Sequence, residues 1–455
     1  MYRPHGKAIV SHVLLHIFQV FSCFVRWGTI YDCGDDDVHA RLVDFARGKL
    51  LCADSGEDLT RAQKYAVLSH WLVLDTTGMC HVISPSKAME REQEQIAKHM
   101  RVCVSIGDEH ATIRGITPSE PILSEAASLV MRDESFRLAD ALADVLNHHN
   151  INPGDQAELI ISAFFTWACD KVVSAAPCAT RGQFSRYFSV TELFKSLFSN
   201  SILPSIMDSP PSLSYAKGTG PTFGQTFGRA YMHFTHFIKP QEQKLLARPY
   251  LPFFMARGAA VFGANSQRGV DAVYPYLYNE LELSHTNVGF ILIQVKKNDI
   301  PLNSRSDIFR NMDPFECGLL QDSDCVDGKF PIPIIRIVFA LCHGPSTQSG
   351  VAQQCYTSPS EGSSSCLPGK RGKRGEISKF TSYDFWCSGI DPNIIEPVKE
   401  GPERWGALIE KADVWKTVYK DAPNGSGDTL HAQYPACGSH NAHFDTWAIG
   451  CPGQE

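Results

Sequence analysis

The sequence predicts an α+β protein, in which a helical N-terminal half precedes a small mixed-sheet domain and a C-terminal extension. Residues 36–203 hold a series of segments with helix-forming composition and capping residues at their starts. The stretch Arg257–Asp299 reads as three consecutive strands, after which a helix and a further strand are expected. A hydrophobic content of 43% and a charged content of 20% are typical of a globular protein long enough for more than one domain.

Residues 36–203 are predicted to form a helical domain, and local signals place its helices. A proline is tolerated in the first turn after Glu120, and Asp155–Glu158 has the spacing of a capping box before an apolar run. No motif of catalysis or cofactor binding appears in this half. The other expected helices are Val38–Leu51, Ala62–Leu74, the strongly polar Ser86–Met100 and the short amphipathic Thr191–Phe198.

Residues 1–35 form an apolar N-terminal segment ahead of these helices. Its run Ile9–Val25 is about 17 residues long and is interrupted by His12, His16 and Gln19, which is short for a membrane span. No small-residue cleavage site follows it. We expect a buried amphipathic helix and no membrane partner, with a secretory signal and a membrane anchor as the alternatives.

The predicted strands of the second half are Ala259–Ala264, Val270–Tyr278 and Phe290–Lys297. The first break, Asn265–Gly269, contains Asn and Gly, which tolerate the positive φ of a tight hairpin. The third strand is apolar on both faces until its end, which suits a strand covered on both sides. This part of the chain therefore predicts a meander of three strands.

Three polar residues lie together at one end of this predicted meander. Side chains alternate along a strand, so Gln294 and Lys296 share one face of the third strand. Asp271 begins the middle strand at the same end of the hairpin. An acid beside a Gln-x-Lys pair in an otherwise apolar meander indicates a candidate site, because polar groups are costly in a buried strand. The alternative is a polar strand end without chemistry.

At these residues the chain resembles the PD-(D/E)XK nuclease superfamily. The core of that family is a helix, a three-stranded meander, a second helix and a further strand. The resemblance implies a restriction-endonuclease-like domain over residues 223–344, in which Asp271, Gln294 and the backbone carbonyl of Val295 hold Mg²⁺ and Lys296 assists catalysis. Gln294 stands where the family usually has an acid.

More closely, the chain is similar to a group of uncharacterised fungal proteins over roughly residues 90–395. The similar phrases are Thr117–Pro121, Gly154–Ile160, Val190–Leu193 and the block from Arg257 to Lys297. Some of those proteins carry a nucleotide-binding domain upstream, whereas no G-x-x-x-x-G-K-[ST] phosphate loop occurs here. We therefore expect the chain to be a shortened version or a fragment of that arrangement.

These residues give two functional hypotheses. The first is a Mg²⁺-dependent nuclease that hydrolyses phosphodiester bonds, with Gln294 in place of the usual acid. The second is a nuclease fold that has lost catalysis and acts as a module binding nucleic acid or another protein. The sequence leaves protein partners unspecified.

The segments on either side of the meander complete the expected domain order. Residues 204–222 contain Pro and Gly pairs and are predicted to be a linker. Phe223–Lys239 is predicted to be an aromatic-rich helix, and Glu242 is either an acid supplied to the site or a surface residue. After the meander we expect a helix over Arg305–Leu320 and a buried strand over Ile332–Leu341.

The remaining sequence divides into a loop and an extension. Residues 345–378 are rich in Ser and Gly and predict a disordered loop, whose basic run Lys370–Arg374 reads as a nuclear-import signal or as a solvated charge cluster. Residues 379–455 form the C-terminal extension, with a strand over Tyr383–Ile390 and a helix over Arg404–Val418. It also holds a cluster that suits zinc or is incidental: His431, Cys437, His440, His443 and Cys451.

Charge and cysteine usage limit the class of protein. A net charge of −7 argues against a surface that binds nucleic acid over its whole area, while leaving a local basic groove open. The 15 cysteines are an odd number with no C-x-x-C pair, which favours reduced thiols. We therefore expect an intracellular protein of the nucleus or cytoplasm.

Overall fold

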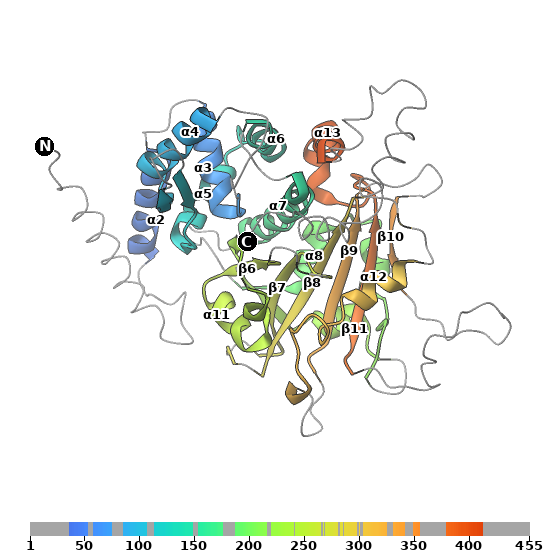
Figure 1. Ribbon diagram of the computed structural model, residues 1–455. Coiled ribbons are helices and arrows are strands. Elements are labelled where there is room, and N and C mark those ends of the chain that lie inside the picture. Colours follow the sequence, from blue (N-terminus) through green and yellow to red (C-terminus); the bar gives the residue numbers. More distant parts are fainter. Residues whose placement is uncertain are drawn as a thin grey trace, which may run out of the picture.

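The computed structural model describes residues 36–412, with gaps inside that range. A unit of helices lies beside a large twisted sheet, and more helices cover the two faces of that sheet (Figure 1). The gaps are residues 53–57, 75–84, 107–112, 149–152, 176–186, 216–219, 241, 265–266, 268, 281–282, 285, 298–299, 301–303, 325–330, 342–348 and 355–378.

The N-terminal half is mainly helical, as the sequence predicts. Local caps fix where two of its helices begin: Thr60 forms a capping box with Gln63, and Ser189 forms one with Glu192. The proline expected in a first turn stands at the start of α5. The helices are α2 (Asp36–Leu51), α3 (Arg61–Trp71), α4 (Pro85–Lys98), α5 (Pro121–Met131), α6 (Leu138–His148), α7 (Pro153–Ser174) and α8 (Val190–Leu197).

A small hairpin that was not predicted from the sequence interrupts these helices. β1 (Val102–Ile106) pairs antiparallel with β2 (Ile113–Ile116), and the register shifts between Cys103 and Ser105. This hairpin is a separate two-stranded sheet beside α4.

The second half builds a nine-stranded mixed sheet. Its main path runs β10-β11-β9-β8-β7-β4-β3, and β6 pairs with both β7 and β5. The strands are β3 (Phe188–Ser189), β4 (Ala230–Met232), β5 (His236–Ile238), β6 (Ala259–Phe262), β7 (Ala272–Tyr278), β8 (Val288–Lys296), β9 (Ile334–Ala340), β10 (Gly350–Gln353) and β11 (Ser382–Ser388). Helices and a mixed sheet together confirm the α+β class.

The order of elements around the meander is helix, three strands, helix, strand. α11 (Leu251–Ala256) precedes the antiparallel strands β6, β7 and β8, and α12 (Arg305–Asn311) precedes β9, which runs parallel to β8. β11 continues the sheet parallel to β9. Residues 382–388 of the expected C-terminal extension are thus an interior strand of the sheet.

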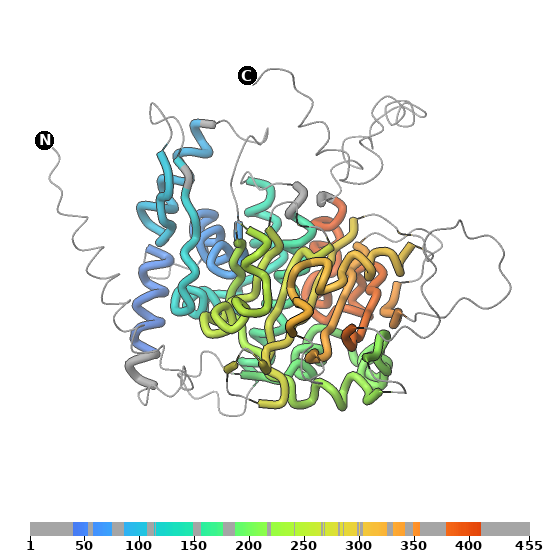
Figure 2. The backbone as a smooth tube through the Cα atoms, turned by 60° about the horizontal axis from the view of Figure 1, so that its bottom comes forward, coloured from blue at the N-terminus to red at the C-terminus, as the bar shows by residue number. Residues whose placement is uncertain are grey.

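Each face of the sheet has its own apolar core because side chains alternate along its strands. One face carries Tyr274, Ile293 and Phe339 and packs against α7 and α8, and this core continues into the N-terminal helices. The opposite face carries Val273 and Leu292 and packs against α11 and α12. Figure 2 shows the helical unit, in blue, to one side of the green-to-orange sheet.

Several segments differ from their sequence expectation. Phe223–Lys239 was expected to be one helix, and this was wrong: only α10 (Phe223–Phe227) is helical, and β4 and β5 follow it. Residues 204–222 include most of α9 (Leu203–Met207), and Ser212 donates its backbone N–H to the Ser382 carbonyl at 2.8 Å. Residues 350–353 form β10, because β11 offers them an edge to pair with.

Other expectations fall outside the described residues. These are the apolar run at 9–25, the basic run at 370–374 and the His and Cys cluster at 431–451. The C-terminal helix is α13 (Pro402–Ala412), and the rest of its expected span, to residue 418, is also outside. Within the part of the chain that is described, no helix is both long and apolar enough to cross a membrane.

Candidate functional site

Asp271 lies immediately before β7 and is held in place by β8 and by the end of β6. Its backbone N–H donates to the Ile293 carbonyl at 2.8 Å, and its own carbonyl accepts the N–H of Gly263 at 2.8 Å. The side chain turns toward β8, where Oδ2 accepts the backbone N–H of Val295 at 2.5 Å. Where the β7–β8 hydrogen-bond ladder ends, the Asp271 carboxylate therefore accepts an N–H that a backbone carbonyl would otherwise accept.

Gln294 and Lys296 lie on the neighbouring strand β8, opposite the start of β7. Both belong to the α11 and α12 face, because they continue the alternation of Phe290 and Leu292. Asp271 shares this face, since it alternates with Val273. The structure thus places all three predicted side chains at one end of two hydrogen-bonded strands and on one face of the sheet.

Burial dominates the electrostatics of Asp271. Loss of solvent raises the pKa of this carboxyl from its ordinary 3.8 to about 6, although the Val295 N–H and the nearby charge of Lys296 both lower it. At neutral pH Asp271 therefore carries a negative charge in poorly solvated surroundings. Such a charge is stabilised by a cation, and Lys296 supplies part of that stabilisation.

Gln294 has a side-chain oxygen, Oε1, that is buried and has no hydrogen-bond partner among the described residues. The residue as a whole is 6% exposed. Leaving such an acceptor unsatisfied costs about 1–3 kcal/mol, so most buried polar atoms find a partner. An amide oxygen is an accepted ligand for a hard cation.

The backbone N–H and C=O of Val295 face Asp271 and the end of β7. Its N–H points to Asp271, and in a strand the N–H and C=O of one residue point toward the same neighbour, so its carbonyl also faces the end of β7. One oxygen of Asp271, the amide oxygen of Gln294 and this carbonyl are the oxygen ligands that Mg²⁺ takes. The oxygens at this strand end are thus one carboxylate and two neutral groups.

Gln267, in the turn between β6 and β7, braces the turn that precedes Asp271 and was not singled out from sequence. Its Oε1 accepts the Ala264 N–H at 2.9 Å, which orients the amide, and its Nε2 is buried without a partner among the described residues. A Cβ built on Gly263 would lie 3.4 Å from Gln267 Oε1 and 3.5 Å from the Asp271 carbonyl. Sequence carries no signal for this role, because Gln is an ordinary turn residue.

Glu242, the acid considered from sequence for the preceding helix, lies on the surface. It precedes the 3₁₀ helix η2 (Gln243–Leu246) and forms an ion pair with Lys244 at 2.5 Å, with 60% of its side chain exposed. Among the described residues, no three His, Cys, Asp or Glu side chains gather where they could hold a metal ion. A cation at Asp271 would therefore depend on neutral oxygens for its other protein ligands.

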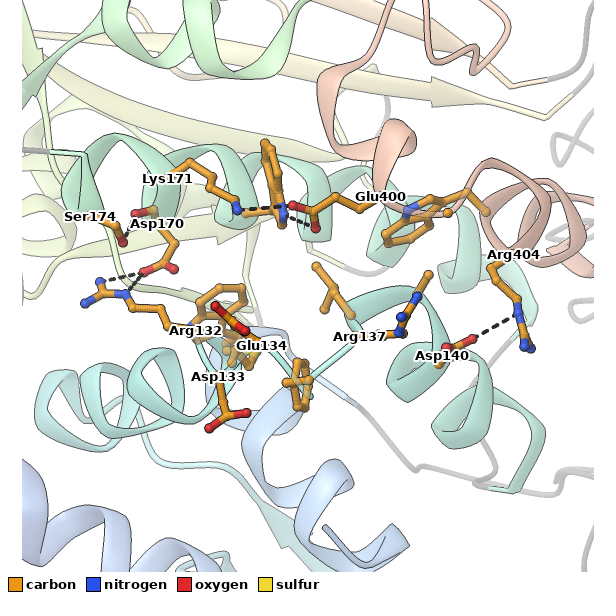
Figure 3. Close-up of a pocket in the computed structure, with 18 residues that line it drawn as sticks. Arg132, Asp133, Glu134, Arg137, Asp140, Asp170, Lys171, Ser174, Glu400 and Arg404 are labelled. Carbon is orange, nitrogen blue, oxygen red and sulfur yellow. Dashed lines mark hydrogen bonds and ion pairs between the residues drawn. The ribbon is translucent and has the colours of Figure 1, made fainter. Parts of the chain in front are cut away.

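A cavity of about 730 Å³ lies elsewhere, between α7, the α5–α6 turn and α13 (Figure 3). Three ion pairs lie among its charged side chains: Arg132 with Asp170 at 2.6 Å, Lys171 with Glu400 at 3.1 Å and Arg404 with Asp140 at 3.2 Å. None of the predicted site residues lines it. The pairs tie α7 to the end of α5 and to Glu400, and they tie α13 to α6.

Comparisons of the chain with protein-family models, with curated proteins and with solved structures found no match. The functional assignment therefore depends on the geometry around Asp271.

Proposed function

We propose that Asp271, Gln294 and the Val295 carbonyl bind Mg²⁺ and that the protein is a metal-dependent nuclease. The observation that carries this proposal is the buried, unpartnered Oε1 of Gln294 beside a carboxylate of raised pKa. Both features cost stability unless a cation satisfies them. The resemblance to PD-(D/E)XK nucleases is part of the same proposal, and the order of helix, meander, helix and strand supports it.

In the proposed phosphodiester hydrolysis, the residues of this chain have separate roles. When bound, Mg²⁺ would polarise the phosphate and lower the pKa of a bound water. Lys296 would orient the attacking water and offset negative charge that builds up on the phosphate. Asp271 must be ionised to hold the metal, so activity should rise with pH around 6.

Purified protein incubated with Mg²⁺ or Mn²⁺ on single- and double-stranded DNA and RNA tests the proposal. We expect cleavage that is lost in Asp271→Ala and Lys296→Ala. Glu242→Ala is the matched control, because it removes an exposed acid outside the site and should leave cleavage unchanged. Cleavage that survives Asp271→Ala would refute the assignment, and binding of nucleic acid without cleavage would favour a module that has lost catalysis.

A further inference from the structure

Within the described part of the chain, strand β5 is an edge strand of the sheet, and the helical unit meets the sheet there. β5 pairs with β6 on one side, and α3 packs against it. His236 is the first residue of β5 and is 2% exposed. Its imidazole is therefore enclosed where the two parts of the fold come into contact.

Hydroxyl groups from both parts of the fold hold the imidazole of His236. The Ser119 hydroxyl, just before α5, lies 2.8 Å from Nε2, and the Thr235 hydroxyl, just before β5, lies 3.0 Å from Nδ1. Thr235 Oγ1 donates its proton to the Gly258 carbonyl at 3.4 Å, so it accepts the Nδ1–H of His236. Nε2 is then the unprotonated nitrogen and accepts the Ser119 O–H, which requires a neutral imidazole.

Arg257, which follows α11, adds a second link and a positive charge. It donates from Nε to Ser119 Oγ at 3.3 Å and from Nη2 to the Ser119 carbonyl, and it lies 4.0 Å from the Glu120 carboxylate. A guanidinium keeps its proton in proteins. A proton gained by His236 would therefore bring a second positive charge to this contact.

The other titratable groups near His236 also oppose its protonation or stay neutral. Burial lowers the pKa of His236 from 6.5 to about 3, and the neighbouring charge of Arg257 adds to this decrease. His70 of α3 and His233, just after β4, lower this pKa further when they are charged. Cys169 of α7 donates to a backbone carbonyl of the same segment and stays neutral, because burial raises the pKa of its thiol.

The helical unit brings two more titratable groups to this contact, and they act in opposite directions. His70 is 3% exposed, and burial lowers its pKa to about 3, against the effect of the His99 backbone and together with that of Arg101. Burial raises the pKa of the Glu120 carboxyl, although Arg257 lowers it. The folded protein therefore resists a proton on His70 and accepts one more readily on Glu120.

We propose that the contact between Ser119, His236 and Arg257 is an acid-sensitive latch that joins the helical unit to the sheet. The latch is closed while His236 is neutral, and it opens when His236 gains a proton. Opening removes the cover of α3 from β5, which has three residues and pairs with β6 alone in the described sheet. An uncovered edge strand of this length loses protection from solvent.

The pH range of the latch follows from the two states of His236. Its ordinary pKa of 6.5 applies when the latch is open, and a pKa of about 3 applies when it is closed. The closed form is therefore fully favoured above pH 6.5 and becomes less favoured as pH falls below that value, because the open form binds the proton more tightly. For this one histidine, the opening constant at pH 5 is about 30-fold larger than at pH 7.5.

Hydrogen exchange of the purified full chain, measured by mass spectrometry at pH 7.5 and pH 5, tests the latch. Protection factors are corrected for the pH dependence of exchange in unprotected amides. In wild type they should fall at least tenfold at pH 5 in peptides that contain β5, where the Thr235 N–H donates to the Gly258 carbonyl at 2.7 Å. Peptides from the interior strand β9 should keep their protection.

Two variants identify the group that takes up the proton. His236→Gln keeps a side chain that can donate and accept hydrogen bonds but cannot gain a charge, so protection of β5 should change less than twofold between the two pH values. His148→Gln is the matched control, because it removes a histidine at the end of α6 whose side chain is 37% exposed. It should show the same fall as wild type.

Histidine ring NMR of wild type between pH 7.5 and pH 4.5 keeps the test decisive even if His236→Gln does not fold. The ring of His236, assigned through its contact with Thr235, should gain its proton only together with the loss of protection in β5. The proposal is overturned if this ring titrates near pH 6.5 while β5 stays protected, or if wild type keeps its protection at pH 5. It is also overturned if folded His236→Gln loses protection as wild type does.

Discussion

Replacing Asp384 by Asn should destabilise the fold by about 3–5 kcal/mol, because it leaves the Arg336 guanidinium buried without its counter-charge. Asp384 is 0% exposed and Arg336 is 1% exposed. The pair is bidentate: Arg336 donates from Nε to Oδ1 at 2.7 Å and from Nη2 to Oδ2 at 2.5 Å. The side chains join β9 to β11.

The surroundings of the pair explain why the loss would be large. Arg336 also donates from Nη1 to the Phe309 carbonyl at 2.7 Å, and its guanidinium lies over the rings of Phe309 and Phe380 at 5.5 and 5.4 Å. It is therefore fixed between the sheet and α12 and cannot turn to solvent. An Asn amide offers one acceptor oxygen for two donors and turns an N–H₂ toward a cation.

Urea unfolding, monitored by circular dichroism, measures this loss of stability. The change in the free energy of unfolding is obtained from the shift in the urea midpoint and from the slope of the transition. Glu396→Gln is the matched control, because the Glu396–Lys399 ion pair is 2.7 Å long but 35% and 47% exposed, and it should cost less than about 1 kcal/mol. A loss below about 1 kcal/mol in Asp384→Asn would refute the reasoning about burial.

Two further predictions concern pH and the backbone. The folded state holds the proton of Asp271 up to about pH 6 instead of the ordinary pKa of 3.8, so stability falls as pH rises between these values and is then level. Asp271→Asn should therefore match wild type at pH 3.5 and exceed it by about 3 kcal/mol at pH 7.5. Equal stability of the two proteins at both pH values in urea titrations would contradict this. Gly258→Ala should cost about 1–3 kcal/mol, because φ is +62° and the new Cβ would lie 2.9 Å from His233 Nε2. Gly406→Ala in α13 should instead stabilise the fold by about 0.5–1 kcal/mol, because no atom lies within 4 Å of the added Cβ. Thermal unfolding measures both variants, and a shift of Tm in the same direction for both would contradict this prediction.

The meander was predictable from sequence because its signals are local. β8 is a continuous apolar run with polar residues at its end, and the break before β7 contains turn residues. The prediction of one helix over Phe223–Lys239 was wrong for a non-local reason. The strands β4 and β5 in this segment are three residues each and depend on pairing with β7 and β6, which lie far along the chain. The hairpin β1–β2, whose strands have five and four residues, was not predicted either.

Only part of the candidate site could be predicted in the same way. Alternation along one strand placed Gln294 and Lys296 together, and the turn length brought Asp271 near them. The unpartnered oxygen of Gln294 and the raised pKa of Asp271 depend on burial by elements distant in sequence. Tertiary packing decides these properties, so a pattern of residue types does not reveal them.

Titration of Mg²⁺ or Mn²⁺ against cleavage, in wild type and in Gln294→Glu, tests the central claim most directly. With one carboxylate, wild type should need metal at a concentration on the order of millimolar, because a neutral amide adds no charge to the site. Gln294→Glu should lower the metal concentration for half-maximal activity at least tenfold and raise the rate. Cleavage whose metal dependence is the same in both proteins, or no cleavage by either at any metal concentration, would contradict a catalytic metal site at Asp271.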